Sequence, residues 1–379
     1  MKHVTFILLL ISSLTYLQAQ TLYPARTKSR YGFIDANGKS VIPETFNEAF
    51  PFYDGRARVK IGKAWTYIDL KGKPIKEAIF ERAYDFENGV ARVAVRAKVS
   101  NVLLYGLIDL DGNWVTQPTF GKIRKFADNG LAMARPSTGD WGFIDKKGNW
   151  RVQPTFSAVK AFQDGLAMVR VDGKWGYIKE DGEWAIEPMY DKLYPFNDGV
   201  AVVGIKGGLM LIDKENNHLW KTPYDIVEGS HNGLIVVRDG KWGALDKDGN
   251  WVIKPSFEYL DSFSGASARC RKNGKWGIVN TKGEWVVPAE FSNALPFVNG
   301  LCRVAKGYRW GYADDTGKVV IAPRFISAGN FIEDVAIVKL GMKWGIIDRN
   351  GNFTAKAIYE AIRTPGETEA EDDAEPDSE

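Results

Sequence analysis

Short apolar runs, separated by turns rich in glycine, aspartate and asparagine, recur along the whole chain. A typical run, Leu166-Ala167-Met168-Val169, leads through Asp172-Gly173 into a second run that begins at Trp175. Asp-Gly and Asn-Gly between apolar runs are strong hairpin signals, because both turn residues can adopt a positive φ. The pattern therefore predicts an all-β protein made of short antiparallel strands.

The pattern repeats with a period close to 34 residues. Its clearest marker is the dipeptide Trp-Gly, found at Trp141-Gly142, Trp175-Gly176, Trp242-Gly243, Trp276-Gly277, Trp310-Gly311 and Trp344-Gly345. Tyr31-Gly32 and Tyr105-Gly106 fit the same frame, and Trp65-Thr66 and Leu209-Met210 are degenerate versions. Ten such units fill almost all of the chain, and the sixth departs most from the pattern. A single unit is too small to bury a core alone, so the units must stack on one another.

The strand that begins at each Trp-Gly is apolar on both faces. In the fourth unit Trp141 and Phe143 point to one side, while Gly142 and Ile144 point to the other. A strand of this kind is covered on both sides, so the sheets must pack face to face. We expect about ten antiparallel meander repeats in a propeller-like ring; the alternative is an open β-solenoid or superhelix.

Two details of the unit are expected from the same residues. The strand Trp251-Val252-Ile253 is expected to stop at Pro255, because proline cannot donate to the ladder. The glycine of each Trp-Gly lacks Cβ, and we expect it to leave room for a large ring from a neighbouring unit.

The sequence Lys-Trp-Gly, seen at Lys241-Trp242-Gly243 and Lys343-Trp344-Gly345 and followed by an aliphatic residue, an acid and a turn glycine, resembles the WG (KWG) repeat family of bacterial proteins. The resemblance runs from about Tyr31 to Tyr359. It implies β-rich repeats with a binding role, often in exported proteins. It brings no catalytic residues and no general enzymatic activity.

An acid recurs shortly after most Trp-Gly dipeptides and could suggest a ring of metal ligands. Each one precedes a tight turn, where an aspartate side chain accepts hydrogen bonds from backbone N–H groups. Lys179 and Asn280 replace the acid in two units, which a turn tolerates and a metal ring does not. We therefore expect turn-capping aspartates, no metal and no cofactor.

A second aromatic column lies nine residues after the Trp-Gly tryptophan, at Trp114, Trp150, Trp184, Trp251 and Trp285. Such rings usually pack in a core, but an exposed column could stack on the apolar faces of sugars. This column is the candidate ligand platform.

Few side chains are suited to other chemistry. His218 and His231 flank the weak sixth unit but have too few neighbouring ligands for a metal site. Cys270 and Cys302 lie at different positions of neighbouring units and are expected to be free buried thiols. No nucleophile elbow, phosphate loop or zinc signature is present.

Both ends of the chain differ from the repeats. Residues 1–19 combine Lys2 and His3, an apolar stretch and Ala19, which is typical of a cleavable export signal; a retained anchor is the alternative. Residues 366–379 contain eight acids and no base, so a solvated acidic tail is expected beside a repeat body, 20–365, of about +10. We expect a periplasmic or extracellular protein with no transmembrane span after cleavage.

The sequence favours a non-enzymatic exported scaffold that binds a macromolecule, most simply another envelope or extracellular protein. A lectin-like module that uses the second tryptophan column is the alternative. A hydrolase centred on His218 or His231 is a third hypothesis, although no nucleophile–base pair can be named. The body is basic and aromatic, but export makes nucleic acid an unexpected partner.

Overall fold

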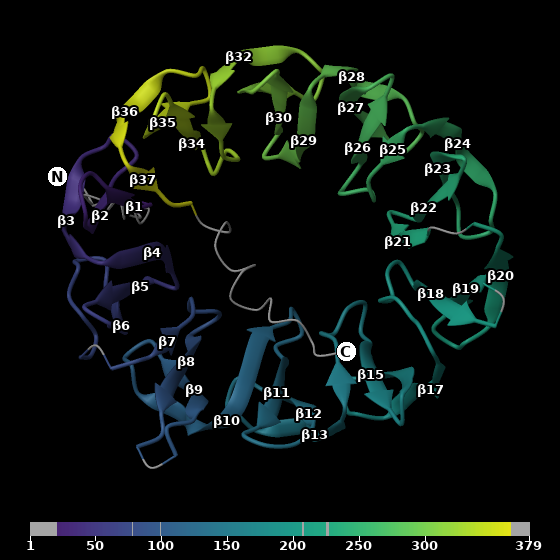
Figure 1. The fold of residues 1–379 in the computed structure, drawn as a ribbon, viewed down its shortest axis with the longest axis horizontal. Coiled ribbons are helices and arrows are strands. Elements are labelled where there is room, and N and C mark those ends of the chain that lie inside the picture. Colours follow the sequence, from purple (N-terminus) through teal and green to yellow (C-terminus); the bar gives the residue numbers. More distant parts are fainter. Residues whose placement is uncertain (1–20, 78, 99, 207, 225–226, 365–379) are drawn as a thin grey trace, which may run out of the picture.

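The computed structural model describes residues 21–77, 79–98, 100–206, 208–224 and 227–364. They form antiparallel sheets arranged as blades around a common centre (Figure 1). The predicted export signal and acidic tail lie outside the described residues. Within the described part of the chain, no helix has the length and apolarity that a membrane span requires.

Each blade is a meander, and in every blade except the first its strands run in chain order from the centre of the ring outward. Blades one to four contain β1 (Tyr23–Arg26), β2 (Tyr31–Ile34), β3 (Ser40–Phe46), β4 (Glu48–Tyr53), β5 (Arg56–Ile61), β6 (Ala64–Ile68), β7 (Arg82–Ala83), β8 (Val90–Arg96), β9 (Leu103–Asp109), β10 (Trp114–Phe126), β11 (Ala132–Pro136), β12 (Trp141–Ile144) and β13 (Trp150–Phe156). Blades five to seven contain β14 (Ala158–Val159), β15 (Ala167–Val171), β16 (Lys174–Ile178), β17 (Trp184–Tyr190), β18 (Val200–Ile205), β19 (Gly208–Asp213), β20 (His218–Thr222), β21 (Val227–His231), β22 (Leu234–Asp239), β23 (Lys241–Leu245) and β24 (Trp251–Phe257). Blades eight to ten contain β25 (Tyr259–Leu260), β26 (Ser267–Lys272), β27 (Lys275–Asn280), β28 (Trp285–Phe291), β29 (Asn293–Val298), β30 (Leu301–Lys306), β31 (Arg309–Asp314), β32 (Val319–Phe325), β33 (Ser327–Ala328), β34 (Val335–Leu340), β35 (Lys343–Asp348) and β36 (Phe353–Tyr359), and β37 (Ala361–Ile362) returns to blade one.

The ring is closed by strands from the two ends of the sequence. The last strand, β37, is the innermost strand of the first blade, where Ala25 pairs with Ile362 and Arg26 with Ala361. Just beyond β37, the Arg363 guanidinium donates to the carbonyl of Ala49 at 2.7 Å. Closure confirms the propeller-like prediction, and it excludes the open solenoid that was the alternative.

The cores lie between blades, as the two-sided strands predicted. Phe143 and Ile144 are adjacent on β12 and both fully buried. Phe143 packs in a cluster with residues of blade five, whereas Ile144 packs with residues of blades three and four. Each blade is therefore covered by both of its neighbours, and a blade alone would leave both apolar faces exposed to water.

The same close approach of two strands explains why each Trp-Gly has a glycine and why the next strand has a proline. A Cβ on Gly142 would lie 2.5 Å from the carbonyl oxygen of Val152 and 2.8 Å from the nitrogen of Pro154. The outermost strand bulges here, because Trp141 pairs with Phe156 while Phe143 pairs with Val152. The expectation that the glycine admits a ring from a neighbouring unit is wrong, because the crowding comes from its own blade: from the backbone and, at Gly277, also from the ring of Trp285.

The same bulge overturns the expected strand stop. In blade seven β24 continues through Pro255 to Phe257, with the register shift between Trp242 and Ala244 of the partner strand. Proline is tolerated at a bulge because no ladder hydrogen bond needs its nitrogen. Pro255 therefore marks the bend of a strand, and not its end.

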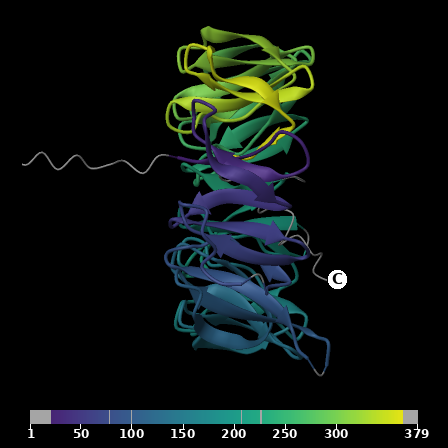
Figure 2. The ribbon, with the colours of Figure 1, turned by 90° about the vertical axis from the view of Figure 1, so that its left-hand side faces the viewer.

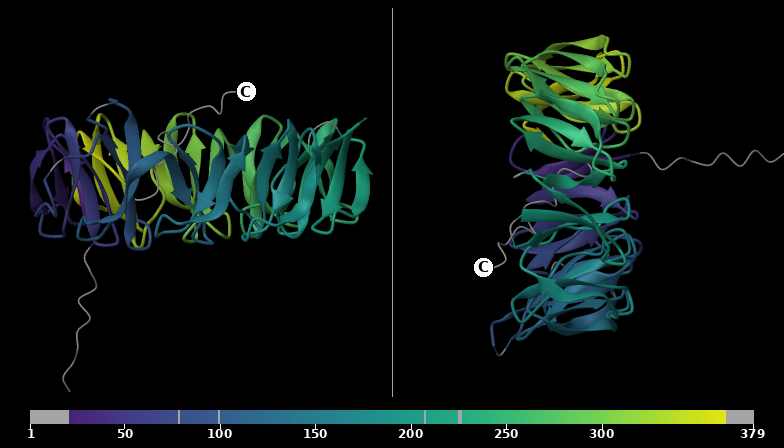
Figure 3. Two further views of the ribbon diagram at one scale, coloured as in Figure 1. Left: turned by 90° about the horizontal axis from the view of Figure 1, so that it is seen from below. Right: turned by 90° about the vertical axis from the view of Figure 1, so that its right-hand side faces the viewer.

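Successive strands run in opposite directions, which sorts the turns onto two faces of a flat-sided ring (Figure 2; Figure 3). One face, here the aspartate face, carries the turns from innermost to second strand and from third to outermost strand. The other, here the lysine face, carries the turns from second to third strand and the links between blades. The hairpin predicted at Asp172-Gly173 lies on the lysine face, with φ of 47° and 78° at its two residues.

Candidate functional site

The recurring acids are turn caps. In blade seven the Asp246 carboxylate accepts the backbone N–H groups of Asp248 and Asn250, at 2.9 and 2.8 Å. The hydrogen bond from the backbone of Asn250 is the main influence that lowers the Asp246 pKa below its ordinary value. Asn280 accepts the same two bonds in blade eight, which explains why an amide can replace the acid. Among the described residues, no three His, Cys, Asp or Glu side chains gather as metal ligands do.

The second tryptophan column lies between blades at the outer circumference. Each ring packs against an aromatic side chain of the preceding blade, with centroid distances of 6.0, 5.5, 6.0, 5.5 and 5.8 Å for Trp114, Trp150, Trp184, Trp251 and Trp285. Trp285 is 39% exposed, and the other four are half-buried. The column thus contributes to contact between blades, and each of its rings also keeps part of its surface exposed.

The turns at the inner edge of the aspartate face connect one blade to the next. The carboxylates of Asp54, Asp164 and Asp198 each accept the backbone N–H of the glycine in the following blade's turn, at 2.7, 2.8 and 2.8 Å. These aspartates also have φ near 50°, a conformation that Asp and Asn tolerate better than most residues. The Asp-Gly signal therefore encodes both a turn and an inter-blade bond.

In the nine blades where this position is among the described residues, the innermost strands carry a phenylalanine column with one interruption. The residue just before the inner turn is Phe52, Phe86, Phe126, Phe162, Phe196, Phe263, Phe297 and Phe331 in eight blades. In blade seven the same position is Ser230, which pairs with Ile235 as Phe297 pairs with Cys302. Ser230 is buried, and its hydroxyl donates to the Asp198 carboxylate at 3.1 Å. A polar group thus replaces an inter-blade ring at this one place.

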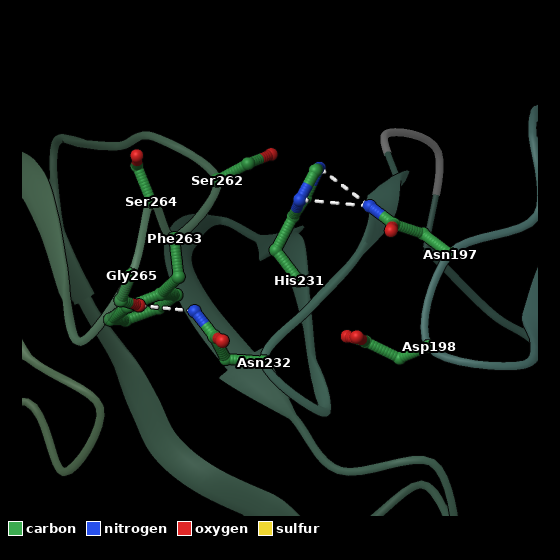
Figure 4. Close-up of a pocket in the computed structure, with 8 residues that line it drawn as sticks. All are labelled: Asn197, Asp198, His231, Asn232, Ser262, Phe263, Ser264 and Gly265. Atoms are coloured by element: carbon green, nitrogen blue, oxygen red, sulfur yellow. Dashed lines mark hydrogen bonds between the residues drawn. The ribbon is translucent and has the colours of Figure 1, made fainter. Parts of the chain in front are cut away.

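A polar pocket of about 470 Å³ opens beside this interruption (Figure 4). It spans the inner turns of three consecutive blades, six to eight. The lining residues are Asn197, Asp198, His231, Asn232, Ser262, Phe263, Ser264 and Gly265. None of them is Lys or Arg, and Phe263 is itself buried, so hydrogen-bonding groups dominate the accessible wall.

Hydrogen bonds between the three turns fix the shape of the pocket. The Asn197 amide nitrogen lies 2.9 Å from Nδ1 of His231, and the Asn232 amide donates to the carbonyl of Gly265 (Figure 4). Oδ2 of Asp198 accepts the Gly233 N–H and the Ser230 hydroxyl. The pocket walls are therefore held by the ring, and binding would require little reordering.

The two histidines are not brought together. His218 is exposed on the outermost strand β20, whereas His231 is at the end of the innermost strand β21. The His231 imidazole is held by an amide, and the carboxylate of Asp198 is bonded to Gly233 and Ser230 instead. This differs from the carboxylate-oriented imidazole that activates a serine nucleophile.

Sequence reasoning named His231 but missed the rest of the pocket. The available signal was Ser230, the one polar residue in a column of phenylalanines. Cys270 and Cys302 are free and buried as predicted, and burial raises the pKa of each thiol to about 12.

A family model described as "WG containing repeat" matches the chain. It matches at 31–63, 65–98, 105–135, 141–175, 175–208, 242–276, 276–310, 310–344 and 344–367. Residues 209–241, which supply Ser230, His231 and Asn232, fall between two matches. Two of the eight residues that line the pocket, His231 and Asn232, therefore come from the unmatched stretch, and the other six come from the matched repeats on either side.

Solved structures resemble the chain in fold, whereas no curated protein sequence matches it. A structure described as the eukaryotic initiation factor is 12% identical, with a TM-score of 0.50 over 90% of this chain and 98% of the other. Kluyveromyces lactis Hsv2p (9% identity, TM-score 0.31, 69% and 94% covered) and PorZ, a surface component of the type-IX secretion system of Porphyromonas gingivalis (13%, 0.25, 92% and 53%), are more distant. The likeness at 12% identity concerns architecture alone.

The predicted resemblance is thus confirmed across most of the repeat body. The chain belongs to the family of proteins built from WG-containing repeats.

Proposed function

We propose that this protein is a non-enzymatic, exported ring scaffold that binds a partner protein at the inner edge of its aspartate face. The observation that carries the proposal is the polar pocket across blades six to eight, whose middle turn belongs to the stretch that departs from the repeat pattern. Extended arrays of repeats commonly act through such surfaces.

The chemistry of the pocket favours a basic side chain of the partner. The wall offers the Asp198 carboxylate, amide oxygens and hydroxyls, and it contains no cation. Further exposed acids lie on the inner turns of other blades, at Asp54, Asp128, Asp164, Glu333 and Asp334. A Lys or Arg would therefore meet both local acceptors and a favourable field.

A hydroxyl-rich glycan is the second candidate, because amide, carboxylate and hydroxyl groups also suit sugars. In that case the candidate stacking surface is the partly exposed outer column of Trp114, Trp150, Trp184, Trp251 and Trp285, and the pocket offers a second set of sugar-binding groups. Catalysis forms no part of either proposal.

Site-specific photo-crosslinking tests the proposal. A photoreactive residue in place of Ser264 should give a discrete adduct in envelope material, and the same residue at exposed Lys254 on the outer strand β24 should not. An adduct destroyed by protease supports the protein partner, whereas a protease-resistant, glycosidase-sensitive adduct supports the glycan.

A matched pair of substitutions tests the role of charge. Asp198→Asn keeps an oxygen for the Gly233 N–H but removes the negative charge, and the adduct should be lost. Asp54→Asn makes the same change at an equivalent turn bonded to Gly89, outside the pocket, and should have no effect. Equal adduct yield from both variants would contradict the assignment of the pocket.

A further inference from the structure

Four consecutive blades present an uninterrupted run of basic turns on the lysine face. We call residues 26–30, 60–63, 306–309 and 339–343 the basic sector. Its four turns contain nine Lys or Arg and no Asp or Glu. Because β37 closes the ring onto β1, blades nine, ten, one and two are neighbours despite their distance in sequence (Figure 1).

The bases of this sector exceed the acids that contact them. Glu360 lies 3.7 Å from Arg26 and 3.8 Å from Lys343, so one carboxylate serves two cations. Lys306 and Arg309 are paired directly across their hairpin, and Glu290, 3.8 Å from Lys306, is the one carboxylate that an ion pair places beside these two cations among the described residues. Like charges in directly opposed positions destabilise a sheet, and an external anion would relieve that repulsion.

Large apolar side chains project from the tips of the same turns. Tyr308 is 94% exposed and Met342 is 79% exposed, and Leu340 and Ile61 are exposed on the turns of blades ten and two. The equivalent tips of blades five, seven and eight are Asp172-Gly173, Asp239-Gly240 and Asn273-Gly274, which are polar. Among the described residues, the large apolar side chains exposed at these tips therefore lie in blades that carry the basic sector or, like Val102 in blade three, adjoin it.

Basic residues around projecting apolar and tyrosine side chains suit the interface of an anionic membrane. Each Lys or Arg near such a surface is attracted to it, and Tyr is favoured at the level of the lipid head groups. The turns project from one flat-sided face of the ring, so a bilayer can contact all four together (Figure 3). We propose that the basic sector docks the ring peripherally on a phospholipid bilayer of net negative charge, with Tyr308 and Met342 inserted among the head groups.

Vesicle co-sedimentation tests this proposal. It uses the full chain as purified, after any cleavage that the expressing cell carries out. The chain should bind vesicles of two parts phosphatidylcholine to one part phosphatidylglycerol, and it should not bind pure phosphatidylcholine. Raised salt should weaken the binding, because the attraction is largely electrostatic. Absence of binding to the anionic vesicles would overturn the proposal.

Two double variants assign the binding to the sector. Lys306→Glu with Arg309→Glu should lower the partition coefficient by at least about tenfold. Tyr308→Ser with Met342→Ser should lower it by about tenfold and leave the dependence on salt unchanged. Circular dichroism and the melting temperature verify that each variant retains the fold.

The control reverses two lysines on the opposite face. Lys71→Glu with Lys73→Glu flanks a turn of the aspartate face and should leave vesicle binding unchanged. A loss equal to that of the Lys306 and Arg309 variant would reduce the effect to net charge and overturn the proposal. A third outcome is that the rings stack on one another through Lys306 and Arg309, as seen by sedimentation, and do not bind vesicles. That result would overturn the membrane proposal and assign the basic sector to the aspartate face of a second copy.

Discussion

The glycine of the Trp-Gly dipeptide should be the least replaceable small residue of each unit. In Gly277→Ala the new Cβ would lie 2.5 Å from the Val287 carbonyl oxygen, 2.7 Å from a ring carbon of Trp285 and 2.9 Å from the Ala289 nitrogen. All three distances are shorter than Cβ atoms ordinarily keep, and two of the three atoms are backbone. The outermost strand would have to move away from its neighbour.

The size of the effect follows from overpacking. Extra methyl groups in tightly packed regions cost about 1–3 kcal/mol, and the backbone contacts here favour the upper end, about 3 kcal/mol. Gly274 is the matched control on the same hairpin, since a Cβ added there would have no atom within 4 Å and the residue's φ is +72°. Gly274→Ala should therefore cost only about 1 kcal/mol, from backbone conformation alone.

Urea unfolding followed by circular dichroism measures both variants against the parent chain. A third chain, with Gly277→Ala and Trp285→Ala together, separates the two possible causes of crowding. Removal of the ring relieves one contact but leaves the carbonyl of Val287 in place, so stability should not recover. Recovery in the double variant, or equal losses at positions 277 and 274, would refute the backbone explanation.

Three further outcomes are expected. Asp85→Ala should destabilise the ring by about 3–5 kcal/mol in urea unfolding, because the Arg58 guanidinium, 2% exposed and 2.7 Å from that carboxylate, would stay buried after losing this carboxylate. The double variant Arg58→Met with Asp85→Leu should recover most of the loss. An unchanged unfolding midpoint for Asp85→Ala would contradict this view. Cys270 and Cys302 should resist Ellman's reagent at mildly alkaline pH, because burial raises the pKa of each thiol to about 12. Both thiols should react once urea unfolds the chain. Rapid reaction of the folded protein would show that the thiols are accessible. The turn aspartates with lowered pKa should stabilise the ring fully above their unfolded pKa of about 4, and this contribution should be lost as the pH falls through the folded pKa. The melting temperature should therefore decline below about pH 4 in an acid titration. A melting temperature that stays constant there would show that the turn hydrogen bonds contribute little.

The repeat architecture could be predicted because its determinants are local and recur. The Asp-Gly turns at positions 164–165 and 172–173 specify hairpins through positive φ, and the two-sided strand at Trp141 requires packing on both faces. Closure depended on a contact that no local pattern encodes. The pairing of Ala25 with Ile362 joins opposite ends of the sequence and was visible only in the structure.

The details that failed concern the geometry of neighbouring strands. Pro255 was expected to end a strand, but a bulge removes the need for its N–H and the strand continues. The pocket was missed for a similar reason, since Asn197, His231 and Ser264 are distant in sequence and meet only across three blades. Ser230 was the local clue, and it became informative only when the phenylalanine column was aligned.

Closure by β37 also determines when the molecule can finish folding. Until the last repeat is available, β1 has an unpaired edge, and such edges are prone to join other chains. Blade one is therefore the first blade to be synthesised and the last to be completed. A chain cut before Ala361 would lose only a short strand. Its ring would nevertheless stay open, with β1 as an unpaired edge strand and no β37 to close it. Premature termination or proteolysis at this end should thus promote aggregation far more than the few missing contacts alone would suggest.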